Sequence, residues 1–489
     1  MVSLPDTAVY LGLAKSLAAG EGYRFNGQES SSYAPGLPLI LAGLRMLFGQ
    51  GYWAANLFVA LCGLAALAMI YLSMRELTGE GGISVVVAIA ASFSCNFYDY
   101  SHRTLSDVPF ALLLWCLIYC LLRFCRGGPR WLILAGLLSV LCVLIRAPAI
   151  VILSPLAAGL LMDRPLLEGF KRRMAACAAV LIPALAALGC LWWLAYQRTP
   201  GMPNYVRVVT TKLGPVGYLF RMAQGLIAVP EATAKVFTNH DSLWPLGIVI
   251  VLLMMAGIWR LWAARGRMAP VVTILTILGL AACLSSYGIN RRYLLPIQPL
   301  MIYLALRGLE KCVDLIARLR KSQGVRQWAI RAAVIFVGPC VILNLPSLVK
   351  TAFYYSYLSH RPDYYQRTRS AHVADLLQIA ELLRQKTSPA ALVGAEDGEI
   401  VHYISGRRTL ALPKVARRDE ADADRLTPYI ASHPELDYLL LDTSSGNNPF
   451  LNRLTATLNA GGNWWLFYRL GRYGLYMRSS LPQPASARS

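Results

Sequence analysis

The chain has 489 residues, of which 56% are hydrophobic and only 15% are charged, and its formal net charge at pH 7 is +21. This composition is too apolar for an ordinary globular protein and indicates a membrane protein with several transmembrane helices. Many of the basic residues lie in short loops between apolar segments, so the charge reflects membrane topology and argues against a nucleic acid partner.

The first predicted element is an amphipathic helix in PDTAVYLGLAKSLAAGEGY, which starts near Asp6 and ends near Gly20. Taken alone, the Asp6 carboxylate is explained by a helix N-cap, although at a membrane surface it could also take a proton from a hydroxyl group. The next segment, YAPGLPLILAGLRMLFG, is short for a membrane span. We expect an interfacial helix anchored by Tyr33 and Tyr52, with a short first span as the alternative.

Ten later segments approach the length of about 20 apolar residues that crosses the hydrocarbon core of a bilayer. Several are shorter and are expected to tilt or to extend by a turn. The predicted spans are Trp53 to Met74, Ile83 to Cys95, Asp107 to Phe124, Trp131 to Ile145, Pro148 to Met162, Ala175 to Tyr196, Leu243 to Trp262, Pro270 to Tyr287, Leu294 to Leu309 and Trp328 to Leu348.

The loops between these spans differ in charge. If Asp6 lies outside, the inside loops are RELTGEGG, RFCRGGPR, DRPLLEGFKRR, RLWAARGRM and RGLEKCVDLIARLRKSQGVR. These loops hold the Lys and Arg excess that marks the cytoplasmic side. The N-terminal segment and everything after Lys350 are therefore expected on the extracytoplasmic side.

The tail reads as a soluble domain, with a helix at Arg369 to Lys386 and strands in AALVGAE, RTLAL, YLLLD, WWLFYRL and GLYMR. The predicted fold is mainly α: a polytopic transmembrane helical bundle with interfacial helices and a small α/β extracytoplasmic C-terminal domain. The predicted domains are residues 1–349 and 350–489.

Charged residues mark the external ends of some spans. Asp107 begins one span, with Asp99, His102 and Arg103 just before it. Such charges are costly in a membrane unless they are paired, so the cluster is either a structural Asp–Arg pair with an N-cap or part of a polar cavity. His102 has no partner at metal-ligand spacing, and a hydrogen-bonded loop residue is the simpler explanation.

Arginines occur at two further external positions. Arg146 interrupts CVLIRAPAIVIL, and Arg291, Arg292 and Tyr293 begin RRYLLPIQP. Interfacial arginines in turns explain these positions without any ligand, and the functional alternative is that the guanidinium groups face a phosphate. The sequence has no Walker loop, no GxGxxG between a strand and a helix and no HExxH motif, so a membrane-borne activated substrate is favoured over ATP.

The order of fragments resembles a known family. D..Y..LA..LA.GEGY, YAPGLPLILAG, SDVPFALLL, LIRAPAIVIL and RRYLLPIQPL are similar to GT-C membrane glycosyltransferases of the protein O-mannosyltransferase and aminoarabinose-transferase type. The resemblance implies transfer of a sugar from a polyprenyl-phosphate carrier to an acceptor on the extracytoplasmic face, with inversion at the anomeric carbon. It also implies a bacterial inner membrane location.

The resemblance implies that Asp6 is the catalytic base. It also implies that Asp107 is the second acidic residue of the family pattern and belongs to the catalytic residues. The residues expected to bind substrate are Tyr10, Tyr33, Arg103, Arg146, Arg291, Arg292 and Tyr293. The donor substrate is a polyprenyl-phosphate sugar, no metal ligands are assigned, and a divalent metal is left open. The expected partners are membrane lipids, the lipid-linked donor and an acceptor glycan, lipid or protein.

The sequence departs from the family pattern in three places. The family has a transmembrane helix before the first acid, and its absence before Asp6 suggests a misassigned start or a truncated gene. A single acid, Asp6, stands where many members have two. Ala34-Pro35-Gly36 replaces Lys-Pro-Pro, which argues against aminoarabinose as the sugar.

Two other functions use parts of the same pattern. A transporter or flippase for a lipid-linked anionic headgroup would need the arginines but not Asp6 as a base. A membrane scaffold would need neither. The inverted repeats or paired broken helices expected of a transporter are not evident in the sequence.

Overall fold

The computed structural model describes residues 5–30, 33–49, 51–162, 169–198, 229–238, 243–264, 269–285, 291–319, 371–412, 420–442, 464–470 and 473–479, together with residues 338, 344, 345, 349, 453, 454, 456 and 481. The chain forms two compact units. One contains Met1–Glu29 with Tyr354–Ser489, and the other contains Ser30–Phe353.

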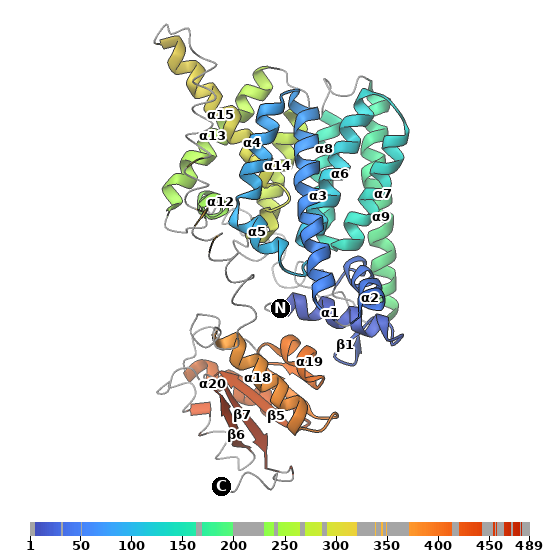
Figure 1. Ribbon diagram of the computed structural model, residues 1–489, viewed down its shortest axis with the longest axis vertical. Coiled ribbons are helices and arrows are strands. Elements are labelled where there is room, and N and C mark those ends of the chain that lie inside the picture. Colours follow the sequence, from blue (N-terminus) through green and yellow to red (C-terminus); the bar gives the residue numbers. More distant parts are fainter. Residues whose placement is uncertain are drawn as a thin grey trace. The chain divides into compact units, whose positions relative to one another are not determined.

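The larger unit is a bundle of helices that run alongside one another (Figure 1). Among the described residues, two 3-10 turns, η1 (Ala147–Ala149) and η3 (Arg291–Leu294), interrupt it. The described helices of this unit are α2 (Gly36–Phe48), α3 (Trp53–Thr78), α4 (Gly81–Ser92), α5 (Cys95–Ser101), α6 (Asp107–Arg126), α7 (Arg130–Ile145), α8 (Ile150–Met162), α9 (Phe170–Arg198), α12 (Val229–Thr238), α13 (Trp244–Ala263), α14 (Ala269–Ser285) and α15 (Gln298–Leu319).

Each predicted span up to Leu309 corresponds to a helix, and Trp328 to Leu348 lies outside the continuously described ranges. Within the described residues, α3, α6, α9 and α13 are long and apolar enough to cross a membrane, and α2, α4 and α7 are shorter apolar helices. The predicted transmembrane helical fold is confirmed. The segment between the predicted spans Ile83 to Cys95 and Asp107 to Phe124 is partly helical, because Ser94 caps α5 by accepting a hydrogen bond from the Phe97 backbone N–H.

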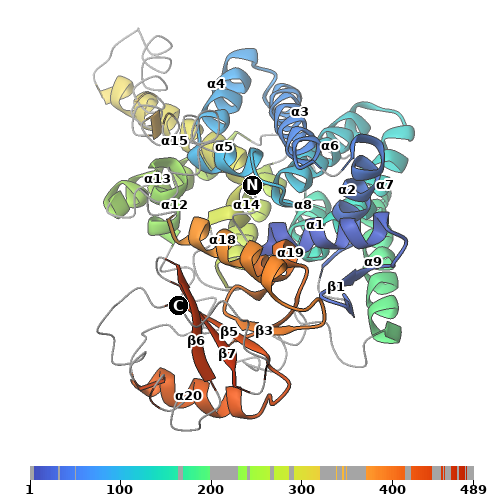
Figure 2. The same cartoon turned by 60° about the horizontal axis from the view of Figure 1, so that its bottom comes forward.

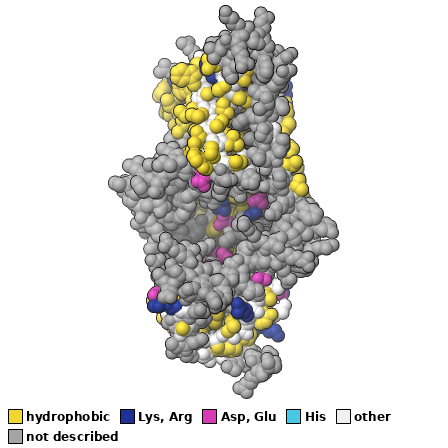
Figure 3. Space-filling model, turned by 90° about the vertical axis from the view of Figure 1, so that its left-hand side faces the viewer, with side chains coloured by type: hydrophobic (Ala, Val, Ile, Leu, Met, Phe, Trp, Pro, Cys, Tyr) yellow, Lys and Arg dark blue, Asp and Glu magenta, His cyan; other side chains and the backbone are white. Residues whose placement is uncertain are grey.

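Large apolar side chains cover the outside of the bundle, as a lipid environment requires. Leu61 and Leu64 of α3 and Ile89 of α4 are among those that are exposed. Figure 3 shows hydrophobic side chains gathered on one face of the bundle. The short helix α2 also exposes Met46 and Leu47 while burying its opposite face, which is the pattern of a helix lying in a membrane interface.

Ion pairs join four of the loops that were expected on one side of the membrane. Glu76, at the end of α3, pairs with Arg123 and Arg126 at the end of α6. Arg307 of α15 pairs with Glu80 before α4 at 2.9 Å, and Arg260 of α13 pairs with Asp314 of α15 at 2.8 Å. These basic loops therefore meet at one end of the bundle.

Helices α13 and α15 approach each other through glycines. A Cβ atom added to Gly257 would overlap the Leu304 carbonyl group, and one added to Gly308 would overlap the backbone of Leu253. Small residues let helix backbones come close in a membrane, where packing rather than hydrophobic burial drives association.

Gly308→Ala is expected to destabilise the bundle by about 1–3 kcal/mol, because the backbone of α13 must move to admit the methyl group. Thermal unfolding in detergent measures the loss. Gly189→Ala is the matched control, since a Cβ at this position in α9 meets nothing within 4 Å and alanine favours a helix. Equal melting temperatures for the two variants would contradict this close approach.

The smaller unit is built on a five-stranded sheet of β3 (Leu392–Ala395), β4 (Arg408–Ala411), β5 (Tyr438–Asp442), β6 (Trp464–Leu470) and β7 (Tyr473–Arg478). The strand order is β4-β3-β5-β7-β6, and β3 is parallel to both β4 and β5. Helices α18 (Ala371–Lys386) and α19 (Gly398–Ser405) lie on one face and α20 (Glu420–Ala431) on the other (Figure 2). All five described tail strands and helix α18 were predicted, whereas α19 and α20 were not assigned. The predicted small α/β domain is confirmed.

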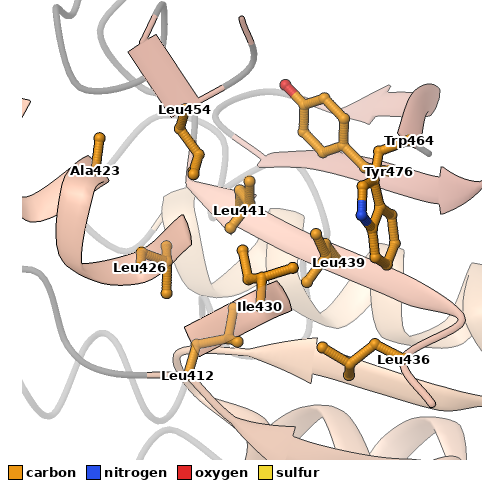
Figure 4. Close-up of a cluster of buried hydrophobic side chains, with 10 residues drawn as sticks. All are labelled: Leu412, Ala423, Leu426, Ile430, Leu436, Leu439, Leu441, Leu454, Trp464 and Tyr476. Atoms are coloured by element: carbon orange, nitrogen blue, oxygen red, sulfur yellow. The ribbon is translucent and has the colours of Figure 1, made fainter. Parts of the chain in front are cut away.

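The core of this unit lies between α20 and the sheet. Leu426 and Ile430 of α20 pack against Leu439 and Leu441, which are two residues apart and therefore lie on the same face of β5 (Figure 4). On the other side of the unit, Arg407 is buried and donates to the Arg384 and Thr387 carbonyl groups. The guanidinium group thus satisfies carbonyl groups at the C-terminal end of α18.

The two compact units divide the chain differently from the predicted domains. Their boundary after Phe353 falls close to the predicted boundary at 349/350, but Met1–Glu29 groups with the C-terminal part of the chain. These first residues form α1 (Pro5–Ala18) and a hairpin of β1 (Arg24–Phe25) and β2 (Gln28–Glu29). The first helix and the distant α/β domain therefore fold as one unit.

Candidate functional site

Asp6 lies in the first turn of α1 and is partly exposed. The helix begins at Pro5, so Asp6 is within the helix rather than at its N-cap. A carboxylate in this turn is stabilised by the unpaired backbone N–H groups of the helix start. Tyr10 follows one turn later and is buried. Burial also raises the pKa of the Tyr23 phenol, with a further contribution from Tyr10, so Tyr23 stays protonated.

Helix α1 packs against β1 and α19 in the smaller unit, and Figures 1 and 2 both place it beside α19. Gly12 faces the Phe25 ring so closely that an added Cβ would lie 2.5 Å from it and 3.6 Å from Tyr403. The Phe25 ring in turn meets His402 edge-on, with ring centroids 4.8 Å apart. The lack of a side chain at position 12 thus lets α1 seat on the hairpin and α19.

The hydrogen bonds of His402 fix its protonation. Its Nδ1 lies 2.6 Å from the Arg407 carbonyl oxygen and must donate, while its Nε2 accepts from the Asn26 backbone N–H at 3.0 Å. Only the neutral imidazole satisfies both bonds. Burial lowers the pKa of His402 below its usual 6.5; the Arg407 carbonyl opposes this shift and the charge of Lys15 adds to it.

The stability of the smaller unit is expected to fall as the pH drops below about 6.5. Below this pH His402 binds a proton in the unfolded chain but stays neutral in the folded chain, so a lower pH favours unfolding. Above this pH His402 is neutral in both states, and its contribution to the pH dependence vanishes. Thermal unfolding of the whole protein between about pH 5 and pH 8 measures this. His402→Gln keeps a neutral acceptor and should flatten the dependence, and an unchanged dependence would contradict the assignment.

In the larger unit, Asp107 and Arg146 form an ion pair. Asp107 is the first residue of α6, and Arg146 follows the last residue of α7, so the pair joins the start of one helix to the end of the next. The bond runs from Arg146 Nη1 to Asp107 Oδ1. The carboxylate side chain is 3% exposed and the guanidinium side chain 13% exposed, so two opposite charges are held together away from water.

Arg103 does not pair with Asp107 in this arrangement. It binds Asp99 on the preceding helical turn at 2.8 Å, and its guanidinium lies 6.0 Å from the centre of the Tyr100 ring. His102 Nδ1 lies 2.9 Å from the Tyr98 carbonyl oxygen, which is the hydrogen-bonded loop role expected for it. The cluster before α6 is thus locally paired.

The other predicted residues are placed as follows. Arg291, Arg292 and Tyr293 form η3, which contacts α5. Arg292 is partly buried, and the side chains of Arg291 and Tyr293 lie outside the described part of the structure. Tyr33 is partly exposed in the bend before α2.

The start of α2 abuts the end of α7. A Cβ atom on Gly36 would lie 2.7 Å from the Leu144 carbonyl oxygen, so the backbones meet two residues before Arg146. The glycine in Ala34-Pro35-Gly36 therefore has a packing reason. Together with α5 and the start of α6, this contact defines the end of the bundle opposite the basic loops.

The structure thus gathers part of the predicted site. Asp107 and Arg146 are bonded, and Arg103 and Arg292 lie at the same end of the bundle as this pair. Asp6 and Tyr10 belong to the other unit. No group of three or more His, Cys, Asp or Glu side chains that could hold a metal ion occurs among the residues described.

Asn26 and the residues of the C-terminal domain were not among the predicted site residues. The Asn26-Gly27 dipeptide in RFNGQE could have identified the hairpin, because Asn-Gly is a strong marker of a tight turn. His402 carried no local signal, because its partner Asn26 is 376 residues away in the sequence.

Comparison with known proteins gives one family match. Residues 32–193 match the model of the dolichyl-phosphate-mannose-protein mannosyltransferase family. No curated protein sequence matches the chain.

Solved structures resemble nearly the whole chain. ArnT from Cupriavidus metallidurans bound to undecaprenyl phosphate is 15% identical, with a TM-score of 0.60, and the likeness covers 98% of this chain and 95% of that one. The archaeal oligosaccharyltransferase AglB from Archaeoglobus fulgidus, in complex with an inhibitory peptide and a dolichol-phosphate, is 13% identical with a TM-score of 0.55, covering 98% and 71%. The chain therefore has the GT-C fold of membrane glycosyltransferases, and the predicted resemblance is confirmed at the level of the fold.

Proposed function

We propose that the protein is an inverting glycosyltransferase that moves a sugar from a polyprenyl-phosphate carrier to an acceptor hydroxyl on the extracytoplasmic face of the membrane. The observation that carries the proposal is the end of the bundle where Arg103, Arg146 and Arg292 lie, opposite the basic loops. Guanidinium groups suit a phosphate, because their donors match its oxygens in pairs. The GT-C fold supports the same chemistry.

In the proposed reaction Asp6 is the base. It takes the proton of the acceptor hydroxyl as the oxygen attacks the anomeric carbon from the face opposite the carrier. The new carbon–oxygen bond forms while the bond from carbon to the phosphate oxygen breaks, and the carrier phosphate leaves with the electron pair. Because this leaving group is a stable anion, the enzyme mainly needs a base positioned at the acceptor hydroxyl and cations that stabilise the departing phosphate.

Arg146 and Asp107 act together in this proposal. Asp107 holds the Arg146 guanidinium at the end of α7, so that the cation is oriented before the carrier arrives. Charge held ready for the transition state is more effective than charge that must reorganise. Arg291, Arg292, Tyr293 and Tyr33 complete the proposed carrier site, and Tyr10 shapes the surroundings of Asp6.

The proposed location is a bacterial inner membrane with the C-terminal α/β domain on the extracytoplasmic side. The support is the meeting of the Lys- and Arg-rich loops at one end of the bundle, because such loops stay in the cytoplasm. The opposite end, with Asp107 and Arg146, then faces outward. The proposed partners are membrane lipids, the lipid-linked donor and an acceptor glycan, lipid or protein.

The test is a transfer assay with the whole protein in lipid vesicles. A panel of polyprenyl-phosphate sugars is supplied with candidate acceptors, and released polyprenyl phosphate is measured together with donor binding. Release with at least one donor, dependent on acceptor, is the expected result. Binding of every donor without release would instead favour a transporter or flippase of lipid-linked headgroups.

A further inference from the structure

The hairpin after α1 is a tight two-residue turn. Asn26 and Gly27 both have positive φ, 58° and 73°, between the paired residues Phe25 and Gln28. Two such residues define a type I′ turn, for which Asn-Gly is the preferred pair. The turn presents the Asn26 side chain and backbone N–H outward from its tip.

The Asn26 side chain pairs with the edge of the distant sheet. Its Nδ2 donates to the Thr409 carbonyl oxygen at 2.6 Å, and its Oδ1 accepts from the Thr409 backbone N–H at 2.8 Å. Strand β4 is the edge strand, so this amide satisfies backbone groups that an edge leaves unpaired. The Asn26 backbone N–H is bonded to His402 on the neighbouring helix.

We call Asn26, His402 and Thr409 the Asn26 latch. It consists of three hydrogen bonds from one residue, two of them to a backbone segment 383 residues away. The adjoining Phe25 ring packs on His402 and against Gly12 of α1. Helix α1 is thereby held to the α/β domain both through the turn and through the ring.

We propose that the Asn26 latch positions the catalytic base. This inference rests on the proposed function, in which Asp6 on α1 deprotonates the acceptor. Residues 5–29 fold with the α/β domain, so the domain sets where α1 lies, and through α1 the position of Asp6. Asn26 and His402 are thus positioning residues, and the C-terminal domain has a defined task in transfer.

Helix α1 cannot hold its place alone. It has 14 residues, about the length at which an isolated helix in water is marginal. The short hairpin is also marginal without a sheet or a helix to pack against. Releasing the latch should therefore loosen α1 and the hairpin together, while the core between α20 and β5 stays intact.

The test compares Asn26→Gly with wild-type protein in lipid vesicles. Glycine adopts positive φ readily, so the turn survives and only the two amide bonds to Thr409 are lost. Hydrogen exchange of peptides from residues 5–29 is measured, together with kcat and the KM for the donor. We expect faster exchange in these peptides, a roughly ten- to hundredfold lower kcat and an unchanged KM.

Ile430→Val is the matched control. It removes one methyl group from the core on α20, which weakens the domain without touching the latch, and it should leave exchange of residues 5–29 and kcat unchanged. A second pair covers the case in which Asn26→Gly folds poorly. His402→Phe keeps the ring and loses the acceptor for Asn26, whereas His402→Gln keeps an acceptor and should restore kcat.

Each outcome decides the proposal. Unchanged exchange of residues 5–29 in both Asn26→Gly and His402→Phe would overturn the latch, and faster exchange with unchanged kcat would overturn its positioning role. A wild-type protein that transfers from no donor would refute the proposed function, and with it the positioning role. The exchange measurement would still decide whether the latch holds α1.

Discussion

Asp6→Asn is expected to lower kcat by about 10²- to 10⁴-fold, the usual contribution of a positioned acid or base. Asparagine keeps the size and polarity of the side chain but cannot accept the proton of the acceptor hydroxyl. The KM for the donor should stay close to that of the wild type, because the arginines that are proposed to hold the carrier phosphate are unaltered. Steady-state transfer rates over a range of donor concentrations separate the two constants.

The control for this substitution is Glu21→Gln. Glu21 is an exposed carboxylate just beyond the end of α1, so the change removes the same charge from the same segment. Its kcat should match that of the wild type. Transfer that survives Asp6→Asn would rule out Asp6 as the base, and an equal loss in both variants would point to a general effect of charge.

The second large effect is expected at the ion pair between Asp107 and Arg146. Either single substitution, Asp107→Leu or Arg146→Met, leaves one buried charge without its partner and should cost about 3–5 kcal/mol of stability. The double variant replaces both charges with apolar side chains and should recover most of this loss. Thermal unfolding of the four proteins gives the coupling energy.

The sugar-transfer activity of the double variant then shows whether the ion pair has only a structural role or also takes part in catalysis. A double variant that is stable but transfers no sugar supports the proposed role of Arg146 at the carrier phosphate, and one that is stable and active contradicts it. Arg453→Ala is the comparison for an ion pair at the surface. Its bond to Asp424 joins side chains that are 49% and 57% exposed, so the change should cost no more than about 1 kcal/mol.

Most of the architecture could be predicted from the sequence, because local patterns carry it. The tail strands are short apolar runs between turn residues, and the run YLLLD became the buried central strand β5. The helical spans follow from the length of apolar segments. The short helix α5 was missed, since its cap Ser94 and its sequence CNFYDYS have no apolar periodicity.

The sequence identified individual residues of the candidate site but not which of them pair with one another. Asp107 and Arg146 were both singled out, but Arg103 stood nearer to Asp107 in the sequence than its actual partner, which is 39 residues away. Which charges pair depends on how α6 and α7 pack, and no local pattern records that. For the same reason the sequence did not show that residues 5–29 fold with the distant α/β domain.

The pairing of Asn26 with Thr409 also has a consequence for biosynthesis. The first helix emerges early from the ribosome, but its binding partners are made 383 residues later. At about 5–20 residues per second this delay is roughly 20–80 s. During that interval α1 and its hairpin have no folded α/β domain to pack against. Under the proposed mechanism, a nascent or C-terminally shortened chain could therefore insert its helices and still lack activity.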